Sequence, residues 1–195
     1  MSDPGPTVVA FRHGETEWSR SGRHTGVTDV ELTARGEAEA EGLRTEVLGS
    51  RPDLVLCSPR HRARRTAELA GLTPYVLDPD LAEWDYGDFE GLTSDEIHHR
   101  VPGWTIWSGP WPAGETATQV SARADRVVRR ILCEPAGSRV AVVAHGHFLR
   151  VLAARWIGEP ARHGRFLALD TGTAGELGWE HAERVLRRWN APVLS

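Results

Sequence analysis

The sequence predicts an α/β fold: a three-layer sandwich in which a mainly parallel central sheet is flanked by helices. Short apolar runs alternate along the chain with longer amphipathic stretches, which is typical of parallel sheets with helical crossovers. The length of 195 residues, with 40% hydrophobic and 26% charged residues, suits one domain, residues 1–195, with a single core. Two small lobes are also compatible with this length.

Three apolar runs are predicted to be buried strands of the sheet: Val8–Phe11, Leu54–Cys57 and Val140–Val143. The last of these is aliphatic throughout, as a central parallel strand should be. The C-terminal part is predicted to add three short strands, at residues 165–169, 175–179 and 184–189.

Four longer helices are predicted, over residues 33–43, 60–69, 115–132 and 149–157. Thr33 suits the N-cap of the first, and Ser58-Pro59 provides a capping serine and a first-turn proline for the second. Gly158 is expected to end the fourth. The third has apolar residues at helical spacing: Val120, Ala124, Val127, Val128 and Ile131.

Residues 78–114 are rich in Pro, Gly, Asp and Trp and are predicted to form long loops with one short helix near residues 94–99. We expect the loop-rich segment of about residues 84–114 to line the active site. Its tryptophans, Trp104, Trp107 and Trp111, are interpreted either as an apolar wall or lid over the leaving group or as simple loop packing.

Composition argues against several classes of function. The net charge of -4 and the pI of about 6.1 disfavour nucleic-acid binding, which needs a basic surface. The aliphatic run at residues 140–144 is too short to cross a bilayer, and residues 1–6 lack the features of a signal peptide. We therefore expect a soluble, cytoplasmic protein with no nucleic-acid or membrane partner. A monomer and a homodimer both remain open.

Basic and imidazole side chains follow the predicted strands. Arg12 and His13 end the first strand, Arg62 follows the second, and His145 follows the central one. Ligands of open α/β sheets bind beyond the carboxyl ends of the strands, so we expect these groups to converge in one crevice. Two guanidinium groups can grip phosphate oxygens, and an imidazole can attack phosphorus. A lone histidine after a strand is more often structural, so the hypothesis of phosphoryl transfer depends on the whole set.

Four segments resemble, in order, the motifs of the histidine phosphatase superfamily, also called the phosphoglycerate mutase-like family: residues 12–18 with 23–26, 57–66, 81–91 and 143–150. The resemblance implies a phosphoglycerate mutase-like fold and a small-molecule phosphate ester as substrate. It implies that His13 attacks the phosphoryl group and becomes a phosphohistidine, while Arg12, Arg62 and His145 bind the transferring oxygens. Glu83 would protonate the leaving group. No metal and no cofactor are expected.

Asp85 is the rival of Glu83 as proton donor, and we favour Glu83 because the resemblance gives this role to the first glutamate of the segment 81–91. The resemblance also marks further substrate-binding candidates: Thr16, Ser19, Arg23, Thr25, Gly26, Gly146 and His147. Ser19 stands where many relatives carry asparagine, which puts its role in doubt. His147 is interpreted either as a contact for a substrate hydroxyl or second phosphate, or as a solvent-facing residue that opens a helix.

The branch of the family is argued from length. Only 61 residues separate Glu83 from His145, and the first arginine pair between them, Arg129-Arg130, lies on a predicted helix. The cofactor-dependent mutases carry a long insertion with extra basic groups there. We therefore expect a phosphomonoesterase, similar to sugar phosphatases of the sedoheptulose bisphosphatase type or to acid phosphatases. The alternatives are a cofactor-dependent phosphoglycerate mutase and an inactive phospholigand-binding module.

Overall fold

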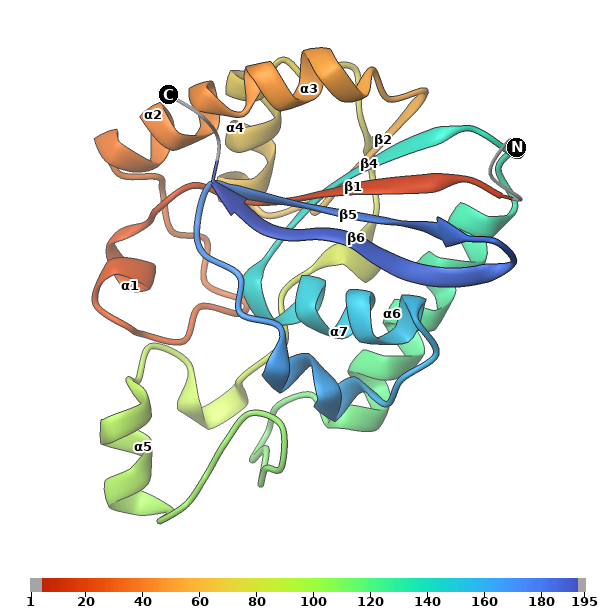
Figure 1. The fold of residues 1–195 in the computed structure, drawn as a ribbon. Helices are drawn as coiled ribbons and strands as arrows, with labels where there is room; N and C mark the ends of the chain where they lie inside the picture. The colour runs from red at the N-terminus through yellow and green to blue at the C-terminus, as the bar shows by residue number, and fades with distance from the viewer. Residues whose placement is uncertain (1–4, 193–195) are drawn as a thin grey trace.

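A six-stranded sheet with the strand order β3-β2-β4-β1-β5-β6 lies between two layers of helices (Figure 1). The structure is a computed structural model and describes residues 5–192; residues 1–4, part of the segment on which the expectation of no signal peptide rests, lie outside the described residues. The strands are β1 (Thr7–Arg12), β2 (Leu54–Cys57), β3 (Val76–Leu77), β4 (Arg139–Ala144), β5 (Thr173–Glu180) and β6 (Glu183–Pro192).

Four neighbouring strands of the sheet run parallel. β4 pairs with β1 on one side and with β2 on the other, and β3 adds to β2 at the edge. β5 pairs antiparallel with β1, and β6 closes a hairpin with β5. The predicted mainly parallel sheet is therefore confirmed, and the carboxyl ends of β1, β2 and β4 meet at one edge.

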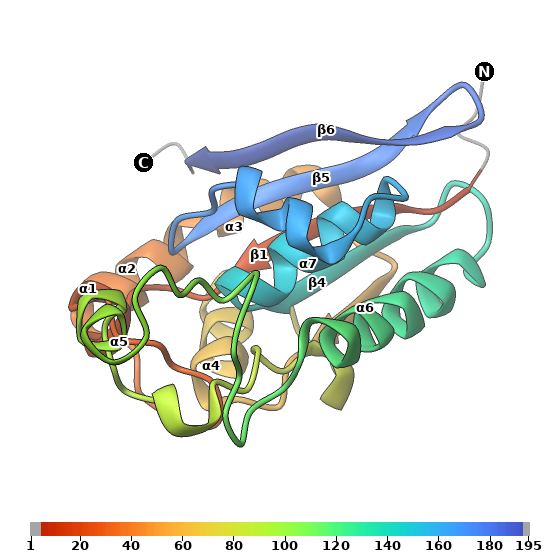
Figure 2. The ribbon, with the colours of Figure 1, turned by 90° about the horizontal axis from the view of Figure 1, so that it is seen from below.

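The helices cover both faces of this sheet. Their bounds are α1 (Glu17–Arg20), α2 (Ala34–Gly42), α3 (Arg44–Ser50), α4 (His61–Ala70), α5 (Ser94–Arg100), α6 (Ala117–Leu132) and α7 (Gly146–Trp156). Three short 3-10 segments are η1 (Pro79–Leu81), η2 (Gly87–Phe89) and η3 (Ala161–Phe166). α2, α3 and α4 lie over one face, and α6 and α7 over the other (Figure 1). Both views place α1 and α5 at the same end of the molecule, beyond the end of β1 (Figure 2).

Alternation along β1 divides the core into two clusters. Val8 and Ala10 belong to the cluster that includes the buried faces of α6 and α7. Val9 and Phe11 belong to the cluster that includes α3 and α4. A strand covered on both faces needs apolar residues at every position, which is the pattern from which it was predicted.

Several predicted helices are confirmed by their caps and buried faces. The Thr33 hydroxyl accepts a hydrogen bond from the Gly36 N–H at 3.0 Å and caps α2. α5 occupies the position predicted for the short helix. α6 buries the five residues expected from its spacing: Val120, Ala124, Val127, Val128 and Ile131. None of the helices in residues 5–192 has the length and apolar character needed to cross a membrane.

The prediction of a strand at residues 165–169 is wrong. The sheet edge beyond β1 is occupied by the β5–β6 hairpin, and this segment ends η3 instead, packed along α7. The carbonyls of Gly164 and Arg165 accept hydrogen bonds from Arg150 of α7, and Phe166 is 69% exposed. Its apolar residues therefore do not indicate a strand.

Two helix starts are also corrected. α7 begins at Gly146 rather than Leu149, with His145 as its N-cap. α4 begins at His61 with Arg60 as N-cap, so Ser58 does not cap it. The Ser58 hydroxyl bonds to His145 instead, as described below. Local sequence pattern gave no signal for α3, which buries Val47 and Ser50, or for the two-residue strand β3, whose side chains are exposed and which pairs with β2.

Candidate active site

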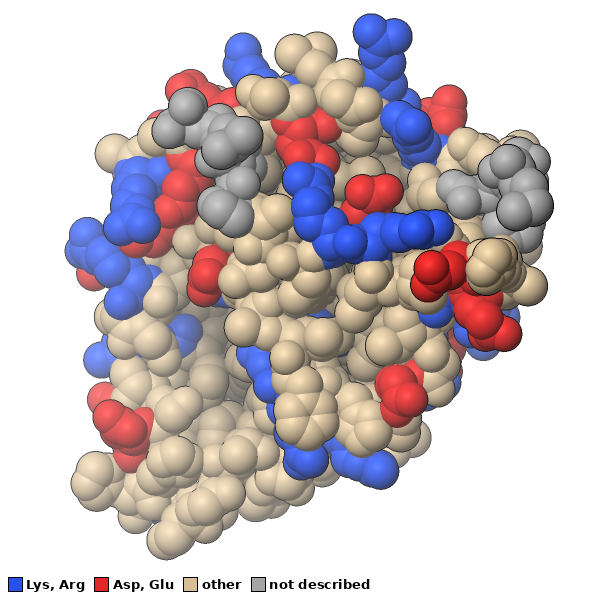
Figure 3. Space-filling model, in the orientation of Figure 1, with Lys and Arg blue, Asp and Glu red and all other residues tan. Residues whose placement is uncertain are grey.

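A cavity of about 280 Å³ opens at the carboxyl edge of the parallel strands. A recess at this end of the molecule is visible in Figure 3, with arginine atoms (blue) beside it; the sequence has no lysine. Residues from the strand exits, from the chain after them and from the loop-rich segment line the cavity: Arg12, His13, Ser19, Arg23, His24, Thr25, Glu83, Tyr86, Ser94, Gly146, His147 and Arg150.

His13 is a buried imidazole at the end of β1. Its Nδ1 lies 2.8 Å from the Gly14 carbonyl, which can only accept, so Nδ1 carries the proton. In the neutral ring the lone pair is therefore on Nε2. Burial, reinforced by Arg62 and Arg12, holds the pKa of His13 well below its usual 6.5. The ring is neutral at physiological pH and has one nitrogen available as a nucleophile.

His145 lies beside His13, with the two ring centroids 5.1 Å apart. Arg62 Nε donates to His145 Nδ1 at 3.1 Å, and His145 Nε2 lies 2.7 Å from the Ser58 hydroxyl. Because a guanidinium only donates, Nδ1 carries the lone pair and Nε2–H donates to Ser58. Burial, followed by Arg62, lowers the pKa of His145 well below 6.5.

Arg62 is fully buried behind this pair. Its terminal nitrogens donate to the carbonyls of Thr28 and Thr25 at 2.9 Å and of Gly26 at 3.3 Å. The structure thus brings Arg62 and His145 against His13 but not onto the cavity wall, where the sequence placed them. Their polar atoms are engaged by protein groups.

Arg12, in contrast, lines the cavity. Its Nη1 donates to the Leu169 carbonyl, and its Nε is buried without a protein hydrogen-bond partner among the described residues. Gly146 leaves the room for this side chain, because a Cβ at residue 146 would lie 3.1 Å from Arg12 Cζ. The guanidinium is therefore available to an anion in the cavity.

Glu83 reaches the cavity from the irregular chain between η1 and η2 and is 9% exposed. One carboxylate oxygen accepts from the N–H groups of Trp84 and Phe148, both at 2.8 Å, and the other from the His147 N–H at 3.0 Å. The first turn of α7 thus holds this carboxylate. Asp85 lines a different cavity, and its carboxylate accepts from the Gly87 N–H. Only Glu83 of the two rivals borders the cavity that contains His13.

His147 and two residues that sequence reasoning missed form a connected group on the cavity wall. His147 Nδ1 lies 2.6 Å from the Tyr86 hydroxyl, and the His24 ring stacks on Tyr86 with centroids 4.7 Å apart. Burial lowers the pKa of His24 to about 4, and burial, followed by Arg150, lowers the pKa of His147 well below 6.5. His147 is therefore a neutral polar group of the cavity, not a residue facing open solvent.

The tryptophans of the loop-rich segment pack behind this group. Trp104 lies 5.2 Å from the His24 ring, and Trp107 lies 5.4 Å from His147. Trp111 stacks on Trp84. None of these three loop tryptophans borders the cavity, so they support its wall from the outside; Tyr86 and Ser94 are the members of residues 84–114 that reach it.

The remaining candidates separate into two groups. Ser19, Arg23 and Thr25 border the cavity. Thr16 is fully buried and caps α1 together with Ser19, whose hydroxyl accepts from the Thr16 N–H at 2.8 Å. The Gly26 N–H donates to Glu90 at 2.9 Å, so Gly26 and Thr16 shape the site without touching the cavity.

The missed residues Ser58, His24, Tyr86 and Arg150 all lie inside the four sequence motifs. Residue type alone could have marked them as polar candidates, but their partners are far away in the sequence. The histidine pair His98-His99 is engaged by the Trp104 and Asp95 carbonyls, and the part of the chain that the structure describes holds no group of three His, Cys, Asp or Glu residues suited to a metal.

The sequence and the fold were compared with those of known proteins. Residues 8–192 match the sequence model of the histidine phosphatase superfamily (branch 1). An acid phosphatase of Mycobacterium tuberculosis is 44% identical over 182 residues, covering 92% of this chain and 89% of the relative. Sedoheptulose 1,7-bisphosphatase of Saccharomyces cerevisiae is 37% identical over 185 residues, covering 78% and 68%. The solved structure of an open reading frame product of M. tuberculosis superposes with a TM-score of 0.91 at 43% identity, covering 96% of this chain and 98% of that chain.

Proposed function

The chain belongs to the histidine phosphatase superfamily, branch 1, and on that premise we propose that it is a metal-independent phosphomonoesterase for small phosphorylated metabolites such as sugar phosphates. Its relatives named as phosphatases support phosphatase activity. The observation that carries the mechanism is the state of His13: a buried, neutral imidazole whose Nδ1–H is donated to Gly14, which leaves Nε2 free to attack phosphorus.

In the first step, His13 Nε2 forms a bond to phosphorus while the bond between phosphorus and the ester oxygen breaks. Arg12 binds the phosphoryl oxygens, and Glu83 gives a proton to the departing oxygen. Arg62 contributes positive charge close to His13, as its effect on the pKa of that ring indicates. We assign to His145, whose two ring nitrogens are engaged by Arg62 and Ser58, the positioning of the neighbouring His13 ring.

In the second step, water attacks the phosphohistidine. Glu83, now a carboxylate, takes a proton from that water, and the bond between phosphorus and Nε2 breaks to release inorganic phosphate and neutral His13. Glu83 suits both steps because it borders the cavity that contains His13 while the start of α7 holds its carboxylate in place.

The rest of the cavity is assigned to the alcohol part of the substrate. Ser19, Arg23 and Thr25 line it, and so do the polar groups of His147 and Arg150. A wall of hydroxyl, imidazole and guanidinium groups suits a hydroxyl-rich, anionic leaving group. This favours a sugar phosphate over an apolar ester.

The mutase alternative requires extra basic groups that hold a second anionic end. In the described chain, none of the arginines between Glu83 and His145 lines the cavity. The absence of such groups from that part of the chain supports hydrolysis rather than isomerisation. The alternative of an inactive binding module differs only in that no covalent intermediate forms.

The test uses purified protein and p-nitrophenyl phosphate in the presence of EDTA. We expect phosphate release that the chelator does not change, and an acid-labile phosphohistidine that His13→Ala abolishes. Hydrolysis that persists in His13→Ala with a normal melting temperature would refute the mechanism. Interconversion of phosphoglycerates, stimulated by the bisphosphoglycerate, would establish the mutase instead.

A further inference from the structure

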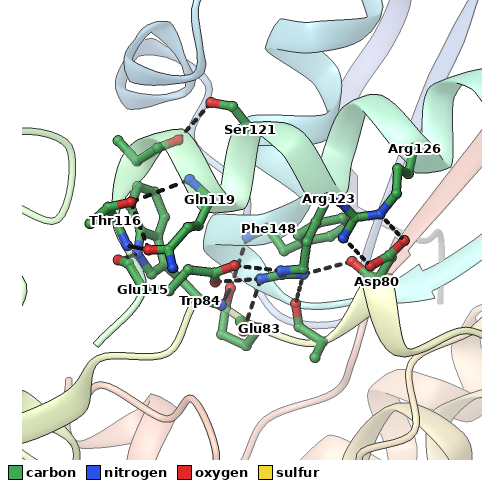
Figure 4. Close-up of polar contacts among 12 residues, drawn as sticks. Asp80, Glu83, Trp84, Glu115, Thr116, Gln119, Ser121, Arg123, Arg126 and Phe148 are labelled. Carbon is green, nitrogen blue, oxygen red and sulfur yellow. Dashed lines mark hydrogen bonds and ion pairs between the residues drawn. The ribbon is translucent and has the colours of Figure 1, made fainter. Parts of the chain in front are cut away.

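Glu83 lies in backbone that belongs to no helix or strand, so other parts of the chain must hold it in place. Besides the start of α7, which binds the carboxylate, Arg123 of α6 contacts this stretch of backbone (Figure 4). Its guanidinium donates to the carbonyls of Asp80 at 2.6 Å and Ala82 at 2.9 Å, and reaches that of Glu83 at 3.4 Å. One side chain thus binds three backbone carbonyls, two of residues that precede Glu83 and that of Glu83 itself.

The same guanidinium also touches the residue that binds the Glu83 carboxylate. It lies over the Phe148 ring at 4.8 Å from the centroid, and the Phe148 N–H donates to the Glu83 carboxylate at 2.8 Å. Arg123 therefore contacts both the backbone of Glu83 and the start of α7, which fixes the carboxylate. A shift of Arg123 would move both supports at once.

Glu115, just before α6, completes this arrangement. Both of its carboxylate oxygens accept from Arg123 at 2.6 Å, and the two side chains are each 14% exposed. Its backbone binds the chain after Glu83: the Glu115 N–H donates to the Asp85 carbonyl at 2.9 Å, and the Glu115 carbonyl accepts from the Trp84 indole at 2.6 Å. A bidentate, largely buried ion pair of this kind is far more restrictive than a surface pair.

We propose that Arg123, oriented by Glu115, is a positioning residue that holds Glu83 at the distance from the ester oxygen that proton transfer requires. The proposal rests on the proposed role of Glu83 as proton donor. Neither Arg123 nor Glu115 borders the cavity that contains His13, so they act on the reaction through Glu83 and not through the substrate.

If Arg123 acts through Glu83, its loss should slow the hydrolysis of some phosphate esters and not of others. An alkyl phosphate has a poor leaving group that must be protonated as it departs, whereas 2,4-dinitrophenolate departs without a proton. Loss of the Arg123 contacts should therefore slow hydrolysis of the alkyl ester and spare the dinitrophenyl ester. A general weakening of the fold would slow both equally.

The experiment compares kcat/KM for glycerol 1-phosphate and 2,4-dinitrophenyl phosphate. For Arg123→Lys, which retains the charge opposite Glu115 but lacks the planar fork, we expect a loss of about 10-fold or more on the alkyl ester and little change on the aryl ester. The double variant Arg123→Met/Glu115→Gln removes both buried charges. It replaces Arg123→Lys in the same comparison if the lysine variant folds poorly. Glu83→Gln should show the same selectivity, with a loss on the alkyl ester of about 100-fold.

Arg126→Met is the matched control. Arg126 lies one turn along α6 and pairs with the Asp80 carboxylate at the surface, without contact to the chain at Glu83. It should leave the ratio of the two rates unchanged. Equal losses on both substrates in the Arg123 variants, or the same selective loss in Arg126→Met, would overturn the inference. Equal losses in Glu83→Gln would instead remove Glu83 as the proton donor, and with it the proposed function of that residue.

Discussion

Arg62 Nε and His145 Nδ1 form a 3.1 Å hydrogen bond between two fully buried side chains that are 83 residues apart in the sequence. This bond fixes which nitrogen of His145 carries the proton, since arginine cannot accept. The imidazole must then donate from Nε2, and the acceptor is Ser58. Arg62 thus donates to His145, and His145 donates to Ser58, in one line of hydrogen bonds next to His13.

Ser58→Ala should break this chain at its end. The His145 Nε2–H would be left buried without an acceptor, which costs about 1–3 kcal/mol of unfolding free energy. Urea denaturation measures this loss. The control is Ser21→Ala, whose hydroxyl bonds to the Glu17 carbonyl on an exposed helix and whose removal should change stability by less than about 0.5 kcal/mol. Equal effects of the two substitutions would show that the Ser58–His145 bond is unimportant.

Gly146→Ala should separate activity from stability. Gly146 is the first residue of α7, where alanine gains less over glycine than the roughly 1 kcal/mol of a helix interior, so we expect the melting temperature to change little. The new Cβ would press on the Arg12 guanidinium at 3.1 Å, and we expect kcat/KM to fall about 10-fold. Gly49→Ala, in α3 with open space at its Cβ, should stabilise without this loss. Full activity in Gly146→Ala would mean that the position of Arg12 is not critical.

His24→Phe should reduce the sensitivity of the fold to acid. Burial lowers the pKa of His24 from 6.5 to about 4, so the unfolded chain binds a proton that the folded chain refuses between these values. Stability is therefore lost as the pH falls below 6.5. Phenylalanine can retain the stacking on Tyr86 and removes a ring nitrogen that has no hydrogen-bond partner in the described structure.

Between neutral pH and about pH 5, the loss of unfolding free energy should be smaller in His24→Phe than in the wild type by about 2 kcal/mol. Urea titrations at the two pH values measure the difference. An unchanged acid dependence would show that His24 is protonated in the folded protein.

His13 should remain neutral at pH 6.5, where an unperturbed histidine is half protonated. Its pKa is held down by burial first, and then by Arg62 and Arg12. ¹⁵N NMR of the imidazole nitrogens, assigned with His13→Gln, should show one protonated and one bare nitrogen at that pH. Arg12→Met removes one of the positive charges and should move the titration of His13 to higher pH. A doubly protonated ring at pH 6.5 in the wild type would contradict the proposed nucleophile.

Prediction from sequence succeeded where the deciding contacts are local or periodic. The apolar run of β4, the Thr33 cap of α2 and the buried face of α6 depend on neighbouring residues and on repeat spacing. It failed at residues 165–169, where the sheet edge was already filled by a hairpin from later in the chain. The same apolar residues are compatible with either outcome, because edge occupancy is not a local property.

The sequence was sufficient to bring forward His13, Arg12, Arg62 and His145 as a set, because parallel strands end at a common edge, and the resemblance to the family added Glu83. Only the tertiary structure shows that Arg12, His13 and Glu83 line the cavity, whereas Arg62 and His145 are buried next to His13. It also decided the proton positions on the two imidazoles and the support of Glu83 by Arg123. These properties are set by hydrogen-bond partners tens of residues away and by the removal of water, and neither is encoded in any single stretch of sequence.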